Sequence, residues 1–266
     1  ILGKRAGLAP RAQAERLVER LTGAHFWVEQ VKTREESYPA LPAFTLSSLM
    51  EAADRLWGWS PARTGEISRI LFEAGWISLP EANDGEICPT DPNHLPRLED
   101  ELADGARLYD LIWRRFEGSK MPPAVEQQRG VSIRTGRTKD APFPLEWRAL
   151  ERVRTVEGFL KAYPEVGSTP NTLPPLVPGQ SLTPLALLLR EQAAPVRFSR
   201  GGLLTPLVQG GVGDATACAA ALERLEVSGL VRLEGNALMP TPLGMKLHDL
   251  LSAHAAAWST PQGAAA

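Results

Sequence analysis

Few side chains in this 266-residue sequence are suited to covalent chemistry. Three tyrosines, Tyr38, Tyr109 and Tyr163, offer hydroxyls that become nucleophiles only with a base or a cation beside them. Cys88 and Cys218 lie far apart and form neither a CxxC motif nor the framework of a secreted protein. The four histidines are His25, His94, His248 and His254. None of them has the spacing of a metal ligand, and no phosphate-binding loop or GxSxG motif is present, so we expect no metal and no cofactor.

The charged residues are unevenly distributed, although the chain is close to neutral. A net charge of −2 and an isoelectric point near 6.2 argue against a generally cationic nucleic-acid binder. Residues 81–110 hold nine acidic residues against two arginines, whereas residues 129–139 hold four basic residues and no acidic one. The simplest interpretation of each charged stretch is a solvent-exposed surface without a partner. The apolar runs are too short to cross a bilayer and no signal peptide is visible, so we expect a cytoplasmic protein without a membrane partner.

Hydrophobic periodicity indicates the elements that must position these side chains. Residues 11–22 have helical spacing and residues 24–33 alternate like a strand. A helix is expected over residues 45–58, and another, amphipathic one over residues 107–116. Residues 122–180 hold much of the proline and glycine between short apolar alternations, which is typical of strands and loops.

Two of the expected helices begin with recognisable caps. Ser48 and Glu51 have the spacing of a capping box, although that helix can begin a few residues earlier. Ser60 and Pro61 are a favourable N-cap and first-turn pair, and the helix they open should end at Gly75. Its apolar face is predicted to contain Ile67, Ile70, Leu71 and Ala74.

A similar pattern recurs near the C-terminus and indicates an internal repeat. Asp214 is a plausible N-cap like Ser60, and in both copies a glycine follows at +15 and a β-branched residue at +17. The second copy continues with a hairpin turning at residues 234–236 and a helix capped by Thr241. Two helices, a hairpin and a third helix form the pattern of a winged helix-turn-helix unit, while two unrelated helical hairpins remain the simpler alternative.

Several segments, taken in order, resemble the bacterial type IA DNA topoisomerases over roughly residues 10–256. The segments are "AFTLSSLMEAADRLWGWSPARTGEISRILFEAGWIS", "EICPTD", "LYDLIWRRFEGSKMPPA", "GFLKAYPE", "GVGDATACAAALERLEVSGLV" and "NALMPTPLGMKLHDLL". The third is the most specific, because it is similar to the family's "LYELIWKRFVASQMAPA". With the last two segments counted as one match, five matches in register make coincidence a poor explanation.

The resemblance implies an α+β fold with a topoisomerase IA-like core, in which two winged-helix (CAP-like) units are joined by a β-rich arch. We expect the following parts: residues 1–43, a helix and strand leading into the arch; residues 44–121, the first winged-helix-like unit plus a helix; residues 122–180, the arch; residues 181–257, the second winged-helix unit; and residues 258–266, a disordered tail.

The resemblance also implies a chemistry that this sequence departs from. Members of the family cut one DNA strand with a tyrosine placed just after the strand that follows "EAGLI"; here that position is Leu79. Glu81 stands where the family has an arginine, so an anion replaces the cation that would stabilise the reacting phosphate. The family's histidine and arginine in "HEAIRPT" fall on Asp84 and Cys88, and the arginine of "GRPSTY" falls on Asp214. The family's acidic, metal-binding Toprim domain has no counterpart in these residues, so we expect no catalytic residue here.

No other tyrosine is expected to replace the missing one. Tyr109 has apolar neighbours at helical spacing and is predicted to lie in the core. Tyr163 matches the tyrosine of the family's "GFLKVY" on the arch, and Tyr38 lies in an extended, proline-rich segment. Ser78 is one position from the right place, but no base accompanies it.

The sequence therefore favours an inactive topoisomerase-like protein that binds DNA, more readily single-stranded, without sequence preference. The candidate phosphate-contacting residues are Arg63, Arg69, Arg114, Arg115, Arg129, Arg134, Arg137 and Lys139. Trp57 and Trp59 are candidates for stacking on unpaired bases, with core packing as the alternative. A second hypothesis is an interaction scaffold that lost DNA binding and contacts a protein partner through acidic residues 81–110. A third is one part of a split topoisomerase, an isomerase that needs a Toprim domain supplied in trans.

Overall fold

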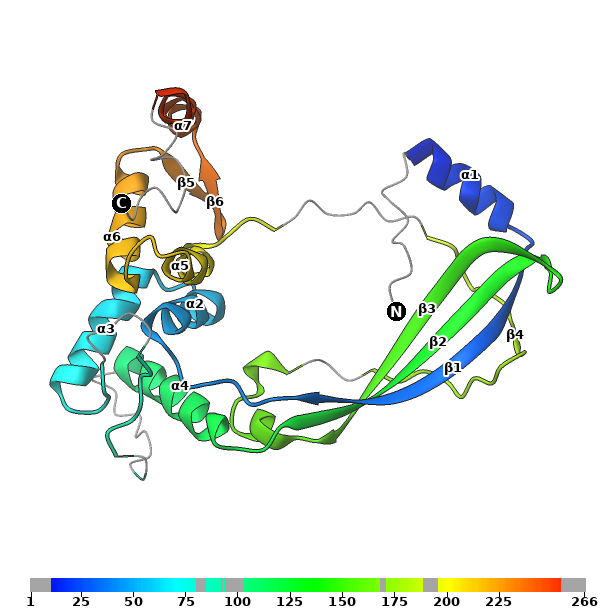
Figure 1. Ribbon diagram of the computed structural model, residues 1–266, viewed down its shortest axis with the longest axis horizontal. Coiled ribbons are helices and arrows are strands. Elements are labelled where there is room, and N and C mark those ends of the chain that lie inside the picture. The colour runs from blue at the N-terminus through cyan, green and yellow to red at the C-terminus, as the bar shows by residue number, and fades with distance from the viewer. Residues whose placement is uncertain are drawn as a thin grey trace. The chain divides into compact units, whose positions relative to one another are not determined.

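The computed structural model describes residues 11–79, 85–91, 93, 103–167, 171–188 and 196–254. The expected tail at 258–266 and the side chains of Glu81 and Asp84 lie outside these residues. The chain divides into two compact units (Figure 1). The first unit contains residues 1–39 and 122–194, and the second contains residues 40–121 and 195–266. Across the described ranges, no helix has both the length and the apolar character that a membrane span requires.

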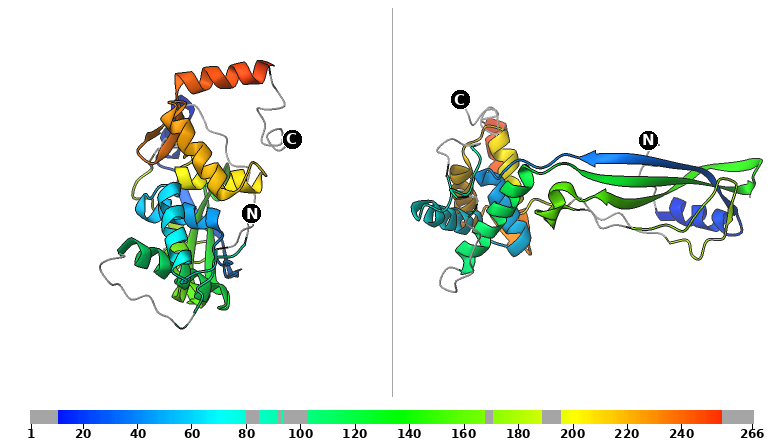
Figure 2. Two further views of the ribbon diagram at one scale, coloured as in Figure 1. Left: turned by 90° about the vertical axis from the view of Figure 1, so that its left-hand side faces the viewer. Right: turned by 90° about the horizontal axis from the view of Figure 1, so that it is seen from below.

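The first unit is built on an antiparallel sheet with the strand order β3-β2-β1-β4. Its elements are α1 (Arg11–Leu21), β1 (His25–Tyr38), β2 (Ala124–Thr138), β3 (Ala141–Val156), η2 (Gly158–Lys161), η3 (Pro164–Val166) and β4 (Ser181–Leu182). Three strands are long and run side by side, as Figure 2 shows, and β4 pairs with β1 only at Phe26 and Trp27. The expected strand over 24–33 is therefore part of a longer one.

The two faces of this sheet differ because side chains alternate along each strand. Val28, Val131 and Ile133 share one face, and Val28 and Val131 are buried there. Gln30, Lys32 and Arg34 follow one another on the opposite face of β1. A register shift between Val28 and Gln30 places an additional residue of β1 opposite β2 at that point. The first face is thus apolar around Val28 and Val131, and the opposite face is polar and basic along Gln30, Lys32 and Arg34.

The second unit contains most of the helices. Its elements are α2 (Leu46–Trp57), α3 (Pro61–Glu73), α4 (Ala103–Ser119), α5 (Arg200–Gln209), α6 (Ala215–Val227), β5 (Val231–Glu234), β6 (Ala237–Pro240) and α7 (Pro242–His254). The strands β5 and β6 form a two-stranded antiparallel hairpin. Together the two units mix helices with antiparallel sheet, as an α+β protein requires.

The predicted caps are confirmed except at α2. Ser60 Oγ accepts a hydrogen bond from the Arg63 amide at 3.2 Å, and Asp214 Oδ1 accepts one from the Ala217 amide at 2.6 Å. The capping box of α2 joins Thr45 to Ser48, so the prediction of a box from Ser48 to Glu51 was wrong by three residues. Glu51 instead accepts a hydrogen bond from Thr205 Oγ1 at 2.6 Å and so ties α2 to α5.

The buried face of α3 also differs from the prediction. Ile70 is 41% exposed, whereas Thr64 and Ser68 are fully buried beside Leu71. The hydroxyl of Thr64 donates to the Ser60 carbonyl and that of Ser68 to the Thr64 carbonyl, at 3.2 and 2.8 Å. Because these hydroxyls are satisfied within the helix, small polar residues can be buried at little cost and let neighbouring helices approach closely.

The close contact of α2 with α5 depends on Gly201. Its amide donates to Oδ2 of the buried Asp54 at 2.8 Å. A Cβ at Gly201 would lie 2.8 Å from both the Asp54 Cβ and the Glu51 Cα. Next to this contact a cluster of apolar side chains forms the core of α2, α5 and α6, built from Met50, Leu204, Val208, Ala215, Cys218 and Ala219.

Candidate nucleic-acid interface

Leu79 ends a short extended segment that is fixed to residues 86–90. The Ser78 amide donates to the Cys88 carbonyl at 2.8 Å, and the Thr90 amide donates to the Trp76 carbonyl at 3.0 Å. Ser78 Oγ accepts from the Cys88 amide at 3.0 Å, so this hydroxyl is held by backbone and has no side-chain base among the described residues. The segment is therefore rigid, and the half-buried Leu79 gives it no reactive group.

Cys88 adds no nucleophile to this corner. Burial raises the pKa of its thiol, and the nearby Glu86 carboxylate raises that pKa further, while Lys120 acts in the opposite direction. A raised pKa keeps the sulfur protonated, and the thiolate is the reactive form.

The tyrosines are likewise unsuited to attack on a phosphate. Tyr109 is 3% exposed, as predicted for a core residue, and packs edge-on against Trp76 with ring centroids 5.5 Å apart. Burial, and secondarily the charge of Asp91, raises the pKa of the Tyr109 hydroxyl. Tyr163 is 1% exposed. Tyr38 is exposed, and its hydroxyl accepts a hydrogen bond from Gln128 Nε2 at 2.8 Å.

The two tryptophans considered for base stacking pack against each other and against arginines. Their ring centroids are 4.6 Å apart, and Trp59 is only 5% exposed. The guanidinium of Arg107 lies 5.0 Å from the ring of Trp57, and that of Arg63 lies 4.9 Å from the ring of Trp59. The alternative of core packing is therefore confirmed for Trp59. A base could stack on Trp57 only after displacing Arg107.

In the second unit, all four candidate phosphate-contacting arginines have partners of their own. Arg63 forms an ion pair with Asp104, Arg69 with Glu73 at 2.5 Å, and Arg114 with Asp110 at 2.9 Å. Arg115 Nε donates to the Pro42 carbonyl at 2.7 Å, and its guanidinium lies 4.8 Å from the Phe44 ring. Three of the four are thus neutralised locally, which weakens their attraction for DNA.

In the first unit, the basic stretch 129–139 does not form one continuous surface. Arg129 and Arg134 are an odd number of positions apart on β2 and point to opposite faces. Arg129 pairs with Glu151 at 2.5 Å and Arg134 with Glu29 at 2.8 Å. Lys139 Nζ donates to the Gly179 carbonyl at 2.9 Å. Arg137 is exposed, and no described residue pairs with it.

The polar face of the same sheet contains a groove that the sequence did not identify. Its volume is about 340 Å³, and its lining includes Lys32, Arg34, Gln128, Gly130, Arg148 and Leu150. These residues come from three strands and meet through cross-strand register, with Gly130 paired to Lys32 on one side and Leu150 on the other. The period-two alternation of Gln30, Lys32 and Arg34 is the signal that would have revealed the basic side of this groove.

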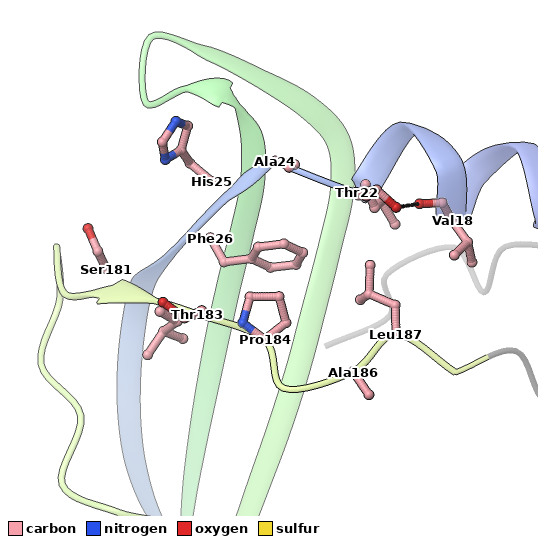
Figure 3. Close-up of a pocket in the computed structure, with 13 residues that line it drawn as sticks. Val18, Thr22, Ala24, His25, Phe26, Ser181, Thr183, Pro184, Ala186 and Leu187 are labelled. Carbon is pink, nitrogen blue, oxygen red and sulfur yellow. Dashed lines mark hydrogen bonds between the residues drawn. The ribbon is translucent and has the colours of Figure 1, made fainter.

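A larger cavity, of about 610 Å³, lies beside the end of α1 (Figure 3). Its walls come from Val18, Phe26, Pro184 and Leu187, and Figure 3 shows the ring of Phe26 beside that of Pro184. His25 is the only ionisable residue in the described lining. A mainly apolar cavity without a cation is poorly suited to phosphate, so the polar groove is the better candidate for nucleic acid.

Comparison with known proteins supports the fold and the family. The family described as DNA topoisomerase matches residues 82–261. The chain is 26% identical to DNA topoisomerase 1 of Pasteurella multocida and 25% identical to that of Pseudomonas aeruginosa. These matches cover 94% and 91% of the chain, but only 33% and 32% of the two relatives. The chain therefore spans about a third of the length of the curated relatives it matches.

A solved structure agrees with this result at the level of the fold. Full-length topoisomerase I from Thermotoga maritima superimposes with a TM-score of 0.76 at 20% identity, covering 95% of this chain and 49% of that one. With the matched family covering most of the sequence and the structural likeness extending over nearly all of it, the chain belongs to the bacterial type IA DNA topoisomerase family.

Proposed function

We propose that this chain is a DNA-binding member of its family that does not itself cleave DNA. The observation that carries the proposal is the corner at Leu79, where the motif order places the tyrosine of the resembled family. Strand cleavage by this family needs a hydroxyl nucleophile and a cation beside the phosphate. The corner offers an aliphatic side chain held on a fixed segment.

The other tyrosines and Cys88 are no better suited to attack a phosphate. Tyr109 and Tyr163 are buried, and burial raises the pKa of both Tyr109 and Cys88. No other side chain among the described residues therefore supplies the nucleophile that Leu79 lacks.

DNA binding is supported by family membership and by the arrangement of helices. We infer that α5, α6, the β5–β6 hairpin and α7 form the second winged-helix unit, and that α2 and α3 belong to the first. Winged-helix units contact both the phosphates of the DNA backbone and the edges of the bases. Phosphate contacts give sequence-independent binding that weakens with salt.

Two measurements on the same preparation test this proposal. Fluorescence anisotropy with a labelled single-stranded oligonucleotide at low salt should show binding at micromolar protein. Plasmid relaxation with Mg²⁺ should show no change in linking number. Relaxation by this chain alone would contradict the absence of catalysis, and no binding at tens of micromolar protein would contradict the DNA-binding role.

A protein scaffold is the second candidate function, and the ion pairs favour it. Five of the eight candidate cations are neutralised by carboxylates. If DNA binding fails, a stoichiometric protein captured from native lysate after nuclease treatment would support the scaffold. The split-topoisomerase hypothesis makes a different prediction, namely relaxation only after a separate Toprim-containing chain is added.

A further inference from the structure

We propose that the polar groove on the sheet of the first unit is the binding site for single-stranded nucleic acid. The groove is the concave, basic part of the sheet face lined by Lys32, Arg34, Gln128, Gly130, Arg148 and Leu150. This inference rests on the proposed function, since it names the surface through which the chain would hold DNA.

The charges around the groove favour an anionic ligand. Lys32 and Arg34 stand on β1 at one side and Arg148 stands on β3 at the other, and no carboxylate lines the groove. Arg34 is held by Gln128 Oε1 at 2.9 Å and by Glu36 at 3.2 Å, and Arg148 pairs with Glu146 at 3.0 Å. Lys32 has no such partner among the described residues, so its ammonium is available to a phosphate.

The next cross-strand row adds more positive charge. Arg152 on β3 is in register with Gln128, which is in register with Arg34. The Nε atom of Arg152 is buried and has no hydrogen-bond partner in the described part of the chain. Basic residues on β1 and β3, the two strands that flank β2, thus follow the groove in the direction of the strands, as the backbone of an extended strand of nucleic acid would.

Gly130 provides independent support for a ligand at this groove. It lies in the middle of the central strand, where glycine is unfavourable because it gives up more conformational freedom than other residues. The backbone does not require glycine there: its φ is not positive, and a Cβ would meet only the Lys32 carbonyl, at an ordinary 3.8 Å. The fold therefore gives no reason for this glycine, whereas a ligand that approaches the strand closely does.

The shape and lining of the groove fit an unpaired nucleotide better than a duplex. Its volume of about 340 Å³ is at the lower end of the range for ligand pockets. Gly130 and the partly exposed Leu150 provide an apolar floor between the two basic sides. Single-strand binding combines these features, with cations along the backbone and an apolar platform for the bases.

Two substitutions in the full chain test the site from different directions. Lys32→Gln removes the unpaired charge, and Gly130→Val fills the groove from its floor. The matched controls are Lys161→Gln, which removes an exposed lysine elsewhere in the same unit, and Ser37→Val, which adds a β-branched apolar side chain on the opposite face of β1. Urea unfolding of every variant establishes that the sheet is intact. We expect Gly130→Val to keep or raise the unfolding midpoint, because an added Cβ meets only the Lys32 carbonyl, at an ordinary contact distance, and valine favours strands.

The readout is anisotropy of a labelled oligodeoxythymidine of about 16 nucleotides, long enough to cover a site of this size. Both substitutions should weaken binding roughly tenfold, and Lys32→Gln should also make the slope of log K against log salt shallower by about 0.7, as one lost phosphate contact predicts. Lys32→Arg should restore most of the affinity, and the two controls should bind like the unaltered chain.

The alternative outcomes separate this inference from the proposed function. If the unaltered chain binds the oligonucleotide and neither groove substitution weakens it, the groove is not the site, while the DNA-binding role stands. If the unaltered chain does not bind, both fail. If a duplex of equal length binds as tightly and with the same dependence on Lys32 and Gly130, the assignment to single strands is wrong. Should Gly130→Val unfold the protein, the fold itself requires this glycine and the inference drawn from it fails.

Discussion

Leu79 lies on a backbone segment that is well held but carries no nucleophilic side chain. The segment around it is fixed by hydrogen bonds from the amides of Ser78 and Thr90 to the carbonyls of Cys88 and Trp76. The geometry of a rigid corner is thus present, but the side chain has no oxygen to attack a phosphate. The neighbouring residues have changed as well, with Glu81 and Cys88 at positions where the resembled family carries arginine.

A tyrosine restored at this position should therefore remain inactive. We expect Leu79→Tyr to form no covalent complex with a labelled single-stranded oligonucleotide, because Glu81 and Cys88 stand where the resembled family carries the arginines that would stabilise the reacting phosphate. Denaturing gel electrophoresis after incubation with Mg²⁺ is the measurement. A shifted, protease-sensitive band would show that the loss of the tyrosine alone had silenced the site.

The packing of α5 on α2 provides a prediction about stability. Gly201→Ala should destabilise the protein by about 1–3 kcal/mol, because the added Cβ lies 2.8 Å from backbone and side-chain atoms of α2 that cannot move independently. The free energy of urea unfolding measures the effect. Gly202→Ala is the matched control: its Cβ would meet only the Ser199 hydroxyl, at 3.1 Å, so its effect should stay within about 1 kcal/mol. Equal effects for the two variants would contradict the close contact.

At the scale of the element, the sheet of the first unit distributes charge in pairs across strands. Arg129 with Glu151 and Arg134 with Glu29 join neighbouring strands, while Arg148 and Glu146 lie two residues apart on β3. The alternation of side chains divides these pairs between two faces. A basic stretch that is continuous in sequence is thus interrupted in space, and the groove collects its cations from strands far apart in the sequence.

Glu146 offers a measurable consequence of this arrangement. Hydrogen bonds from Arg148 and from Ser132 Oγ lower the pKa of its carboxyl from 4.5 to about 2. Because this pKa lies below that of the unfolded chain, the interaction contributes to stability above about pH 4.5 and is lost as the pH falls through about 2. An NMR titration of the Glu146 carboxyl should show the low midpoint, and Arg148→Gln should raise it towards 4.5. A midpoint that is unchanged by this substitution would contradict the assigned cause.

At the scale of the whole molecule, a nearly neutral chain pairs many of its cations with carboxylates. Among the described residues on the three long strands of the first unit, Lys32, Arg137 and Arg152 are the cations that lack a carboxylate partner. If the chain binds single strands, its affinity should therefore depend only moderately on salt.

This expectation can be expressed as a slope. For roughly three phosphate contacts, log K should fall with log salt with a slope of about −2. Anisotropy titrations between about 50 and 200 mM salt provide the measurement. A slope of about −5 or steeper would mean that cations other than these three strand residues also contact DNA.

The sequence by itself determined the local features of this protein. The caps at Ser60, Asp214 and Thr241 and the burial of Tyr109 follow from residue type and short-range periodicity, and the structure confirms them. The family could also be identified from the sequence, because several motifs occur in a fixed order. The absence of a nucleophile at Leu79 was likewise readable there, since it depends on side-chain type at one position.

Only the tertiary structure decided which charges remain available. Arg134 meets Glu29 across 105 positions of the chain, and Arg63 meets Asp104 across 41. Such pairs depend on strand register and helix packing, which short-range patterns do not specify. The same holds for the groove, where Lys32, Gly130 and Leu150 become neighbours only when three strands pair. The residue types thus decide which reactions the chain cannot catalyse. The pairing of distant segments decides which cations remain available to bind a nucleic acid.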